Sequence, residues 1–217
     1  KKLIIYPKKI KKKNNIEALN KNDVEFIVNF KTINMESNEN KFKGIFMIGC
    51  MVLFKKNGEY IQEFKQFTSK DLTDLEEELI VKQWIEYMES FEEKIKKKKF
   101  KIYHWGKAEQ IIYKQLNNKI NCKKLNFIDM LDIFKKEPII VKDSFSYGLK
   151  DIVKSLYKHG MIKEIWEENM NGKEAMIQAM EDYNNKETKK TMEIIGKYNY
   201  YDCKVIDEIL IILRDMI

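Results

Sequence analysis

The spacing that most suggests chemistry joins a tyrosine to an aspartate near the end of the chain. Tyr198 and Asp202 are four residues apart in a segment with helical hydrophobic periodicity, and residues four apart lie on one face of a helix. A phenol and a carboxylate would then point into one site, where the carboxylate could hold a divalent cation and the phenol could orient a water that attacks a phosphodiester. Taken alone, the spacing is more typical of a helix with a buried aromatic residue and a cap-like aspartate.

The other reactive residue types exclude several kinds of site. His104 and His159 are the only histidines. A three-histidine metal site is therefore excluded, and only two residues could serve as the base of a Ser-His-Asp triad. No GxGxxG or GxxxxGK[ST] segment is present, so nucleotide-fold chemistry is unsupported. The cysteines, Cys50, Cys122 and Cys203, lie far apart and form no CxxC pair. This pattern argues against a disulfide framework or a zinc site and favours a reducing, intracellular compartment.

Composition and charge favour a globular protein with an anionic partner. Of the 217 residues, 44% are apolar, which suits one sizeable core. The formal net charge of +7 favours nucleic acid or an anionic membrane surface. The alternative is an A/T-rich genome, which would produce this lysine content without selection for binding. The lysine run at 96–99 likewise indicates either a solvated turn or a phosphate contact. No apolar run approaches the roughly 20 residues that span a bilayer, so we expect no membrane segment.

Hydrophobic periodicity predicts the elements that would position these side chains. Apolar and β-branched patterns indicate strands at 24–32, 44–54, 60–67 and 100–105, with a loop at 34–43 and an Asn-Gly turn at 57–58. Helical spacing indicates helices at 72–91, 107–116, 127–134, 148–159, 174–183 and 191–217, the first capped by Ser69 or Asp71. We expect residues 139–141 to add a fifth strand. Residues 1–22 are expected to form a basic arm or linker ahead of an α/β domain at 23–217.

Further segments occur in the order of known nuclease motifs. Residues 26–32, Phe-Ile-Val-Asn-Phe-Lys-Thr, resemble the hhhDhET first motif of DEDD exonucleases, with Asn29 and Lys31 in place of the aspartate and the glutamate. Residues 103–109, Tyr-His-Trp-Gly-Lys-Ala-Glu, resemble the second motif, in which most members have aspartate where Glu109 stands. Residues 145–152 resemble the helix start before the third motif, and residues 198–202 resemble the third motif in its tyrosine form.

The chain thus resembles the ribonuclease-H-like DEDDy exonucleases over roughly residues 24–214. Residues 131–139 and 198–203 also resemble strings of a predicted ribonuclease-H-like domain that often follows a RecB-like nuclease domain. The resemblance implies a mixed five-stranded sheet whose first three strands are antiparallel, flanked by helices. It implies a 3′–5′ exonuclease that hydrolyses phosphodiesters with two Mg²⁺ or Mn²⁺ ions. The implied catalytic positions are Tyr198, Asp202, Glu109, Asn29 and Lys31.

The resemblance also implies partners. Single-stranded DNA or RNA would enter the site by its 3′ end, and a neighbouring nuclease or helicase domain would accompany this one. The expected nucleic-acid contacts are His104, Trp105, Lys107 and Lys150. A structural role for His104 and core packing for Trp105 are the more usual interpretations, and contact with a substrate is the alternative for both.

The first motif departs from the family where the metals should bind. Two cations clamp the attacking and leaving oxygens in such hydrolysis, and hard cations prefer carboxylate oxygens. Asn29 keeps an oxygen without a charge, whereas Lys31 has no acceptor and adds a positive charge. Glu109 and Asp202 remain as metal ligands, with two negative charges in place of four. We predict that Lys31 pairs with Asp202 or Glu109 and replaces a metal electrostatically, so that metal binding is weakened or lost.

Three functions follow from this pattern. The first is a 3′–5′ exonuclease, and the second is a pseudonuclease that holds nucleic acid or a protein without cutting. The third is a scaffold for a neighbouring nuclease domain.

The origin of the two changes is a separate question. Asp-to-Asn and Glu-to-Lys are single-base changes that favour natural divergence, although Asp-to-Asn is also a usual engineered inactivation. We expect an intracellular protein, cytoplasmic or nuclear, from a large DNA virus, a protist or a low-GC bacterium.

Overall fold

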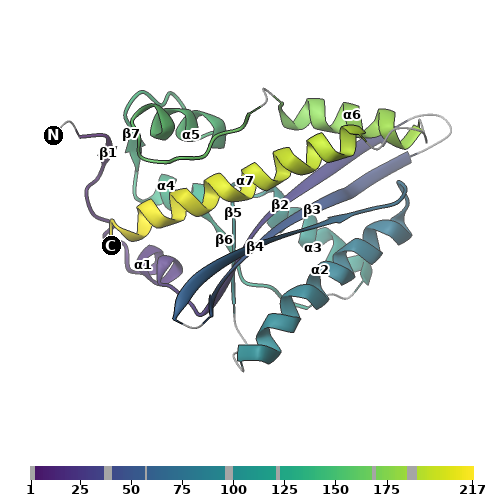
Figure 1. Ribbon diagram of the computed structural model, residues 1–217, viewed down its shortest axis with the longest axis horizontal. Coiled ribbons are helices and arrows are strands. Elements are labelled where there is room, and N and C mark those ends of the chain that lie inside the picture. Colours follow the sequence, from purple (N-terminus) through teal and green to yellow (C-terminus); the bar gives the residue numbers. More distant parts are fainter. Residues whose placement is uncertain are drawn as a thin grey trace.

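A five-stranded sheet organises the described part of the computed structural model, which comprises residues 3–36, 41–56, 58–95, 100–120, 123–167, 170–184 and 190–217 (Figure 1). Its strands are β2 (Val24–Glu36), β3 (Lys41–Lys56), β4 (Glu59–Thr68), β5 (Lys101–His104) and β6 (Phe127–Asp129). The helices are α1 (Lys13–Leu19), α2 (Asp74–Ile95), α3 (Ala108–Ile120), α4 (Met130–Lys136), α5 (Leu149–Lys158), α6 (Gly172–Asn184) and α7 (Lys190–Arg214).

The strand order across the sheet is β4-β3-β2-β5-β6. β2, β3 and β4 form an antiparallel meander, and β5 and β6 extend the sheet in parallel beside β2. The parallel addition is possible because α2 returns the chain from the end of β4 to the start of β5, a connection that two parallel neighbours need. The predicted α/β fold class, a mixed sheet with three antiparallel strands first, is confirmed.

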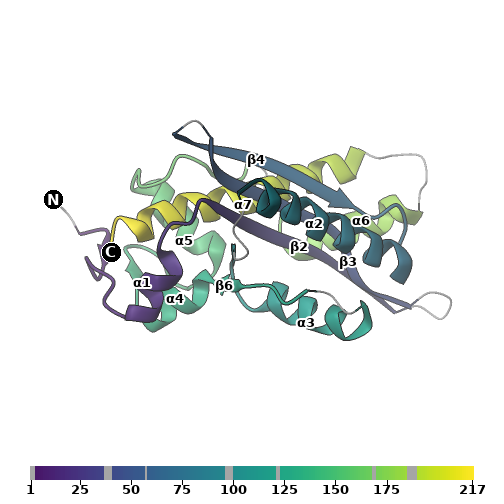
Figure 2. The ribbon, with the colours of Figure 1, turned by 90° about the horizontal axis from the view of Figure 1, so that it is seen from below.

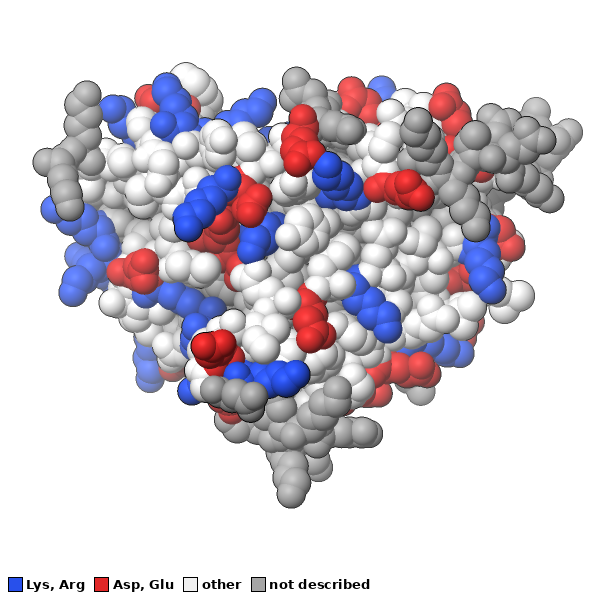
Figure 3. All heavy atoms as spheres, viewed as in Figure 1, with Lys and Arg blue, Asp and Glu red and all other residues white. Residues whose placement is uncertain are grey.

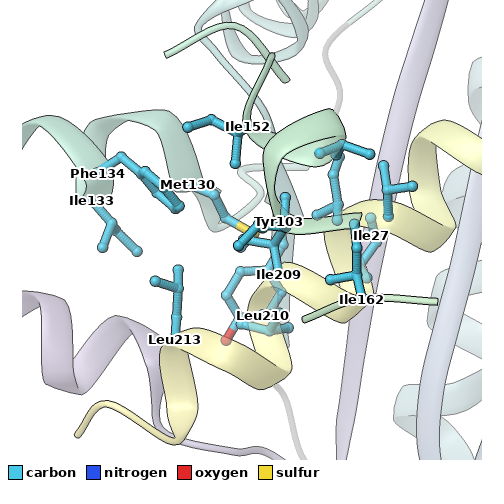
Figure 4. Packing of buried hydrophobic residues seen from close by; sticks show 14 of the residues in the cluster. Ile27, Tyr103, Met130, Ile133, Phe134, Ile152, Ile162, Ile209, Leu210 and Leu213 are labelled. Atoms are coloured by element: carbon cyan, nitrogen blue, oxygen red, sulfur yellow. The ribbon is translucent and has the colours of Figure 1, made fainter. Parts of the chain in front are cut away.

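The two faces of the sheet carry separate hydrophobic clusters. Side chains alternate along a strand, so Phe26, Val28 and Phe30 of β2 pack with α2 and α3 on one face. Ile27 lies on the other face, in the cluster that contains the C-terminal half of α7. Figures 1 and 2 show α7 running across this second face, opposite α2 and α3. Figure 4 shows the α7 residues Ile209, Leu210 and Leu213 in this cluster with Ile27, Tyr103 and the α4 residues Met130, Ile133 and Phe134.

Two predicted elements are wrong around the fifth strand. Residues 127–129 form β6, the fifth strand of the main sheet, and not the start of a helix. Asp129 ends this strand because its side chain accepts a hydrogen bond from the Leu131 backbone N–H at 2.9 Å and so caps α4. The residues predicted to be the fifth strand instead contain β7 (Ile140–Val141), which pairs with β1 (Ile5–Tyr6) in a separate two-stranded sheet.

The predicted N-terminal arm packs against the domain. The Ile10 backbone N–H donates to the Met216 carbonyl oxygen at 2.8 Å, and both Ile10 and Leu19 are buried. Arg214 at the end of α7 donates through Nε to the Leu19 carbonyl oxygen and through Nη2 to the Glu25 carboxylate. The backbone at Ile10 and at Leu19 is therefore held beside the end of α7.

Smaller boundaries also differ from expectation. β2 continues to Glu36 and β3 begins at Lys41, so much of the predicted loop at 34–43 is strand. Thr73 caps α2 in place of Ser69 or Asp71, because its Oγ1 accepts from the Glu76 N–H at 3.3 Å. Asn57, the lysine run at 96–99 and Cys122 lie outside the described residues. Within the described residues, no helix has both the length and the apolar character to cross a bilayer.

Candidate functional site

β2 places the residues that resemble the first motif under α7. Asn29 and Lys31 follow Ile27 at two-residue spacing, so their side chains leave the sheet on the face that α7 covers. Phe30 between them points to the opposite face, where its ring packs against Trp84 of α2. The strand pattern that buries the core therefore also directs Asn29 and Lys31 towards the C-terminal helix.

α7 brings Tyr198 and Asp202 to the same face because it lies close to β3. Asn199 is fully buried against Gly49, and a Cβ atom at Gly49 would lie 2.8 Å from the Asn199 side chain. The Cys203 thiol contacts the Gly49 carbonyl oxygen at 3.7 Å. This glycine allows the helix to approach the sheet, and the approach places Asp202 within reach of β2.

Lys31 and Asp202 form a buried ion pair between Nζ and Oδ2. Their side chains are 8% and 5% exposed, so solvent screens the pair little. The pairing predicted for Lys31 is confirmed, with Asp202 as its partner. The other carboxylate oxygen, Oδ1, accepts a hydrogen bond from the Trp166 indole at 2.9 Å. Both oxygens of Asp202 therefore already have a donor from the chain itself.

Tyr198 lies between two ammonium groups. Its ring centroid is 4.1 Å from Lys31 Nζ and 5.2 Å from Lys150 Nζ. Burial raises the pKa of Tyr198, and the negative charges of Asp202 and Glu174 raise it further, so the phenol stays protonated at neutral pH. Burial lowers the pKa of Lys150, whereas the nearby Asp202 carboxylate opposes that shift. Tyr198 and Lys150 can therefore act as a hydrogen-bond donor and a cation beside Asp202.

Glu109 belongs to a second buried pair. Its Oε2 lies 3.5 Å from His104 Nδ1, and its Oε1 accepts a long hydrogen bond from the Phe30 N–H at 3.5 Å. His104 is fully buried and its ring packs edge-on against Phe127. Within the described residues, Asn29 Oδ1, Glu109 Oε2 and both His104 nitrogens have no hydrogen-bond partner. The second-motif acid thus lies with His104 and not in the Lys31 ion pair.

The remaining predicted contacts are divided between the core and the surface. Trp105 donates to the Tyr147 carbonyl oxygen at 3.2 Å, and its ring centroid lies 5.1 Å from that of Phe134, so it packs against the core. Lys107 is exposed just before α3. Lys150 is the predicted contact that reaches the Tyr198 site.

Trp166 is the site residue that sequence reasoning missed. It lies between α5 and α6, and it contacts Asp202 through its indole N–H and Lys150 across its ring. A tryptophan in an otherwise polar segment, shortly before the helix with the Tyr-x-x-x-Asp spacing, was the available signal. A hollow of only about 20 Å³ remains beside Trp166 and Tyr198. The indole of Trp166 also covers one oxygen of the Asp202 carboxylate through its hydrogen bond.

These residues do not fit a pair of divalent cations. Two such ions need several oxygen ligands with negative charge, but Lys31 occupies one oxygen of Asp202 and Asn29 supplies no charge. No group of three or more His, Cys, Asp or Glu in the described ranges is placed to hold a metal ion. The arrangement can offer an ammonium and a phenol hydroxyl to an anion or a polar group through Lys150 and Tyr198, but it offers no carboxylate cage.

Comparison with known proteins agrees with this architecture. The family model of the RNase H superfamily matches residues 32–213, which includes the sheet from the middle of β2 onward and nearly all of α7. The matched range begins just after Asn29 and Lys31. No curated protein matches the chain. RNase H-like nucleases generally use divalent metal ions. The chain belongs to the RNase H superfamily.

Proposed function

We propose that this chain is a DEDDy-type 3′–5′ exonuclease domain whose altered first motif has removed metal-dependent hydrolysis. The observation that carries the proposal is the buried ion pair between Lys31 and Asp202. An ammonium at this position satisfies the carboxylate that a metal would otherwise need. Tyr198 and Asp202 keep the spacing of the third motif. The site therefore keeps this sign of common ancestry with active exonucleases but lacks the carboxylates that would bind the metals.

In this proposal, the residues that remain hold nucleic acid without cutting it. Lys150 and Tyr198 supply a cation and a hydroxyl donor, which suit a phosphate oxygen. Trp166 and Tyr201 supply partly exposed aromatic rings beside the exposed Lys197, and aromatic rings stack on bases without regard to sequence. A single strand of DNA or RNA is therefore the proposed ligand. The second candidate, a scaffold for a neighbouring nuclease domain, would need neither feature.

A nuclease assay with Mn²⁺ tests the loss of hydrolysis. The chain as written is compared with Asn29→Asp/Lys31→Glu, which restores the carboxylates of the first motif, on 3′-labelled single-stranded DNA and RNA. We expect cleavage by the restored protein and none by the chain as written. Cleavage by the chain as written would refute the proposal. Cleavage by neither protein would favour a binding or scaffold role over an inactivated exonuclease.

A matched variant separates chemistry from folding in this assay. Asn29→Asp/Lys31→Gln adds one carboxylate and removes the ammonium without adding the second acid. We expect this variant to bind the strand but to cleave it far more slowly than the restored protein, because two cations need both acids. Equal cleavage by the two variants would contradict the assignment of a metal-ligand position to residue 31.

A further inference from the structure

A basic surface lies at the N-terminal end of the domain, away from the Tyr198 site. Its members, which we call the N-terminal basic patch, are Lys8, Lys9, Lys11, Lys12, Lys13, Lys135 and Lys136. All seven are exposed. The acidic residues among or beside them are Glu17, Asp132, Glu137 and Asp215, the last of which lines the same hollow as Lys8. Seven lysines against four carboxylates leave three net positive charges here, out of +7 for the whole chain.

The fold gathers these lysines from two distant parts of the sequence. Glu137, at the end of α4, accepts hydrogen bonds from the Lys11 N–H at 3.2 Å, the Lys12 N–H at 2.8 Å and Asn15 Nδ2 at 2.8 Å. These bonds lower the pKa of Glu137 against the opposing effect of its burial. They also fix the start of α1 against the last turn of α4, where Lys135 and Lys136 lie. In Figure 3, lysine side chains gather at the left of the molecule, beside the N-terminal segment and α1.

Most of this charge is not neutralised within the domain. Lys13 approaches Glu17 at 3.8 Å, and Lys136 pairs with Asp132 at 2.6 Å. In the described part of the chain, Lys8, Lys9, Lys11 and Lys135 have no ion-pair partner, which leaves four ammonium groups free for an external anion. Their backbone is already ordered, so an anion that binds them loses little affinity to ordering the chain.

The chemistry of α1 favours nucleic acid over a membrane. A helix that binds a bilayer surface presents an apolar face to the lipid, but Ile16 and Ala18 pack against the core and Leu19 is fully buried. The outward residues of α1 include Lys13, Asn14 and Glu17, which offer charge and polarity without an apolar surface. A row of phosphates is the ligand that matches exposed ammonium groups of this kind.

The length of α7 between Asp202 and Arg214 gives a scale for a strand that runs from the Tyr198 site towards the patch. Arg214 ties the end of α1 to α7 through the Leu19 carbonyl oxygen at 2.9 Å, and Arg214 is twelve residues from Asp202. At 1.5 Å per residue, that interval is about 18 Å along the helix. It corresponds to about five nucleotides at the stacked rise of a nucleic-acid strand.

We propose that the N-terminal basic patch binds the phosphodiester backbone of the single strand whose end lies at the Tyr198 site. This inference rests on the proposed nucleic-acid binding of that site and adds a second, sequence-independent contact to it. The patch would determine the affinity for long strands and leave short ones unaffected. It would also account for most of the salt dependence of binding.

Fluorescence anisotropy with labelled oligothymidylates tests the patch. The patch variant carries Lys8→Gln, Lys9→Gln, Lys11→Gln and Lys135→Gln. The control variant carries Lys43→Gln, Lys70→Gln, Lys114→Gln and Lys173→Gln, four exposed lysines outside the patch, and has the same net charge. We expect the patch variant to bind a strand of about 16 nucleotides at least about tenfold more weakly than the control. Its slope of log affinity against log salt should be smaller in size by up to about 3, at about 0.7 per lost phosphate contact.

The two strand lengths and a vesicle separate the outcomes. A strand of about 4 nucleotides is too short to span both surfaces, so both variants should bind it equally. Equal affinity of both variants for the long strand would overturn the inference and leave the proposed binding at the Tyr198 site intact. Loss of binding to phosphatidylserine vesicles, with unchanged binding to the strand, would overturn it in favour of a membrane. Absence of oligonucleotide binding by every protein, the parent included, would overturn both proposals.

Discussion

Replacing Lys31 with methionine should destabilise the domain strongly. Methionine keeps the length of the apolar part of the side chain but removes the ammonium, so the 5% exposed Asp202 carboxylate keeps only the Trp166 indole as donor. Breaking a buried ion pair on one side costs about 3–5 kcal/mol. At about 2–4 °C per kcal/mol for a domain of this size, the melting temperature should fall by roughly 6–20 °C. Urea denaturation, followed by tryptophan fluorescence, measures the free energy of unfolding directly.

A double-mutant cycle isolates the ion pair from other effects of the substitution. Asp202→Asn keeps an oxygen for the Trp166 N–H and removes the charge, so Lys31→Met/Asp202→Asn should recover much of the loss. We expect a coupling energy of at least about 2 kcal/mol. As a control, Lys82→Met breaks the exposed pair with Glu78, which should cost less than about 1 kcal/mol. Additive single effects in the cycle, or a cost for Lys31→Met as small as the control, would refute the reasoning.

Three further predictions concern the surroundings of this pair. Gly49→Ala should destabilise the domain by about 1–3 kcal/mol, because its Cβ would meet the Asn199 side chain. Adding Asn199→Ala should relieve most of that cost, and chemical denaturation of both proteins measures the two free energies of unfolding. Trp166→Phe should cost about 1.5–3 kcal/mol, since it removes a hydrogen bond to the Asp202 carboxylate; an unchanged unfolding midpoint would contradict the contact. Burial raises the pKa of Asp207, so ionising it in the folded state is unfavourable. Asp207→Asn should therefore raise the melting temperature at pH 7, and the gain should shrink as the pH falls towards about 4, where the unfolded chain also protonates this group; thermal scans at both values measure it.

The sequence was sufficient to predict the central sheet because its strands carry strong local signals. Residues 44–54 are apolar almost throughout, as expected of β3, which has neighbours on both sides. The short elements were not predictable in this way. β6 has three residues, and its type depends on Asp129 capping the next helix and on pairing with β5. β7 depends on β1, which lies more than 130 residues earlier in the chain.

The candidate site was predictable in its charges but not in its surroundings. The ion pair of Lys31 was predicted from the resemblance of residues 26–32 to a motif with a carboxylate at this position, because a buried ammonium needs a counter-ion. The contact of Trp166 with Asp202 could not be inferred, because it depends on the course of the chain between α5 and α6. Periodicity also could not decide whether His104 faced a cleft or the core, and the structure buries it against Phe127.

The most direct test of the account compares thermal unfolding with and without Mn²⁺ for the chain as written and for Asn29→Asp/Lys31→Glu. If Lys31 takes the place of a cation, the chain as written should melt at the same temperature with and without Mn²⁺. The restored protein should melt lower without metal, because its acids repel each other. It should gain about 2.7 kcal/mol of stability at a metal concentration 100 times its dissociation constant. An equal Mn²⁺-dependent rise in both proteins would contradict the claim that Lys31 replaces the metal.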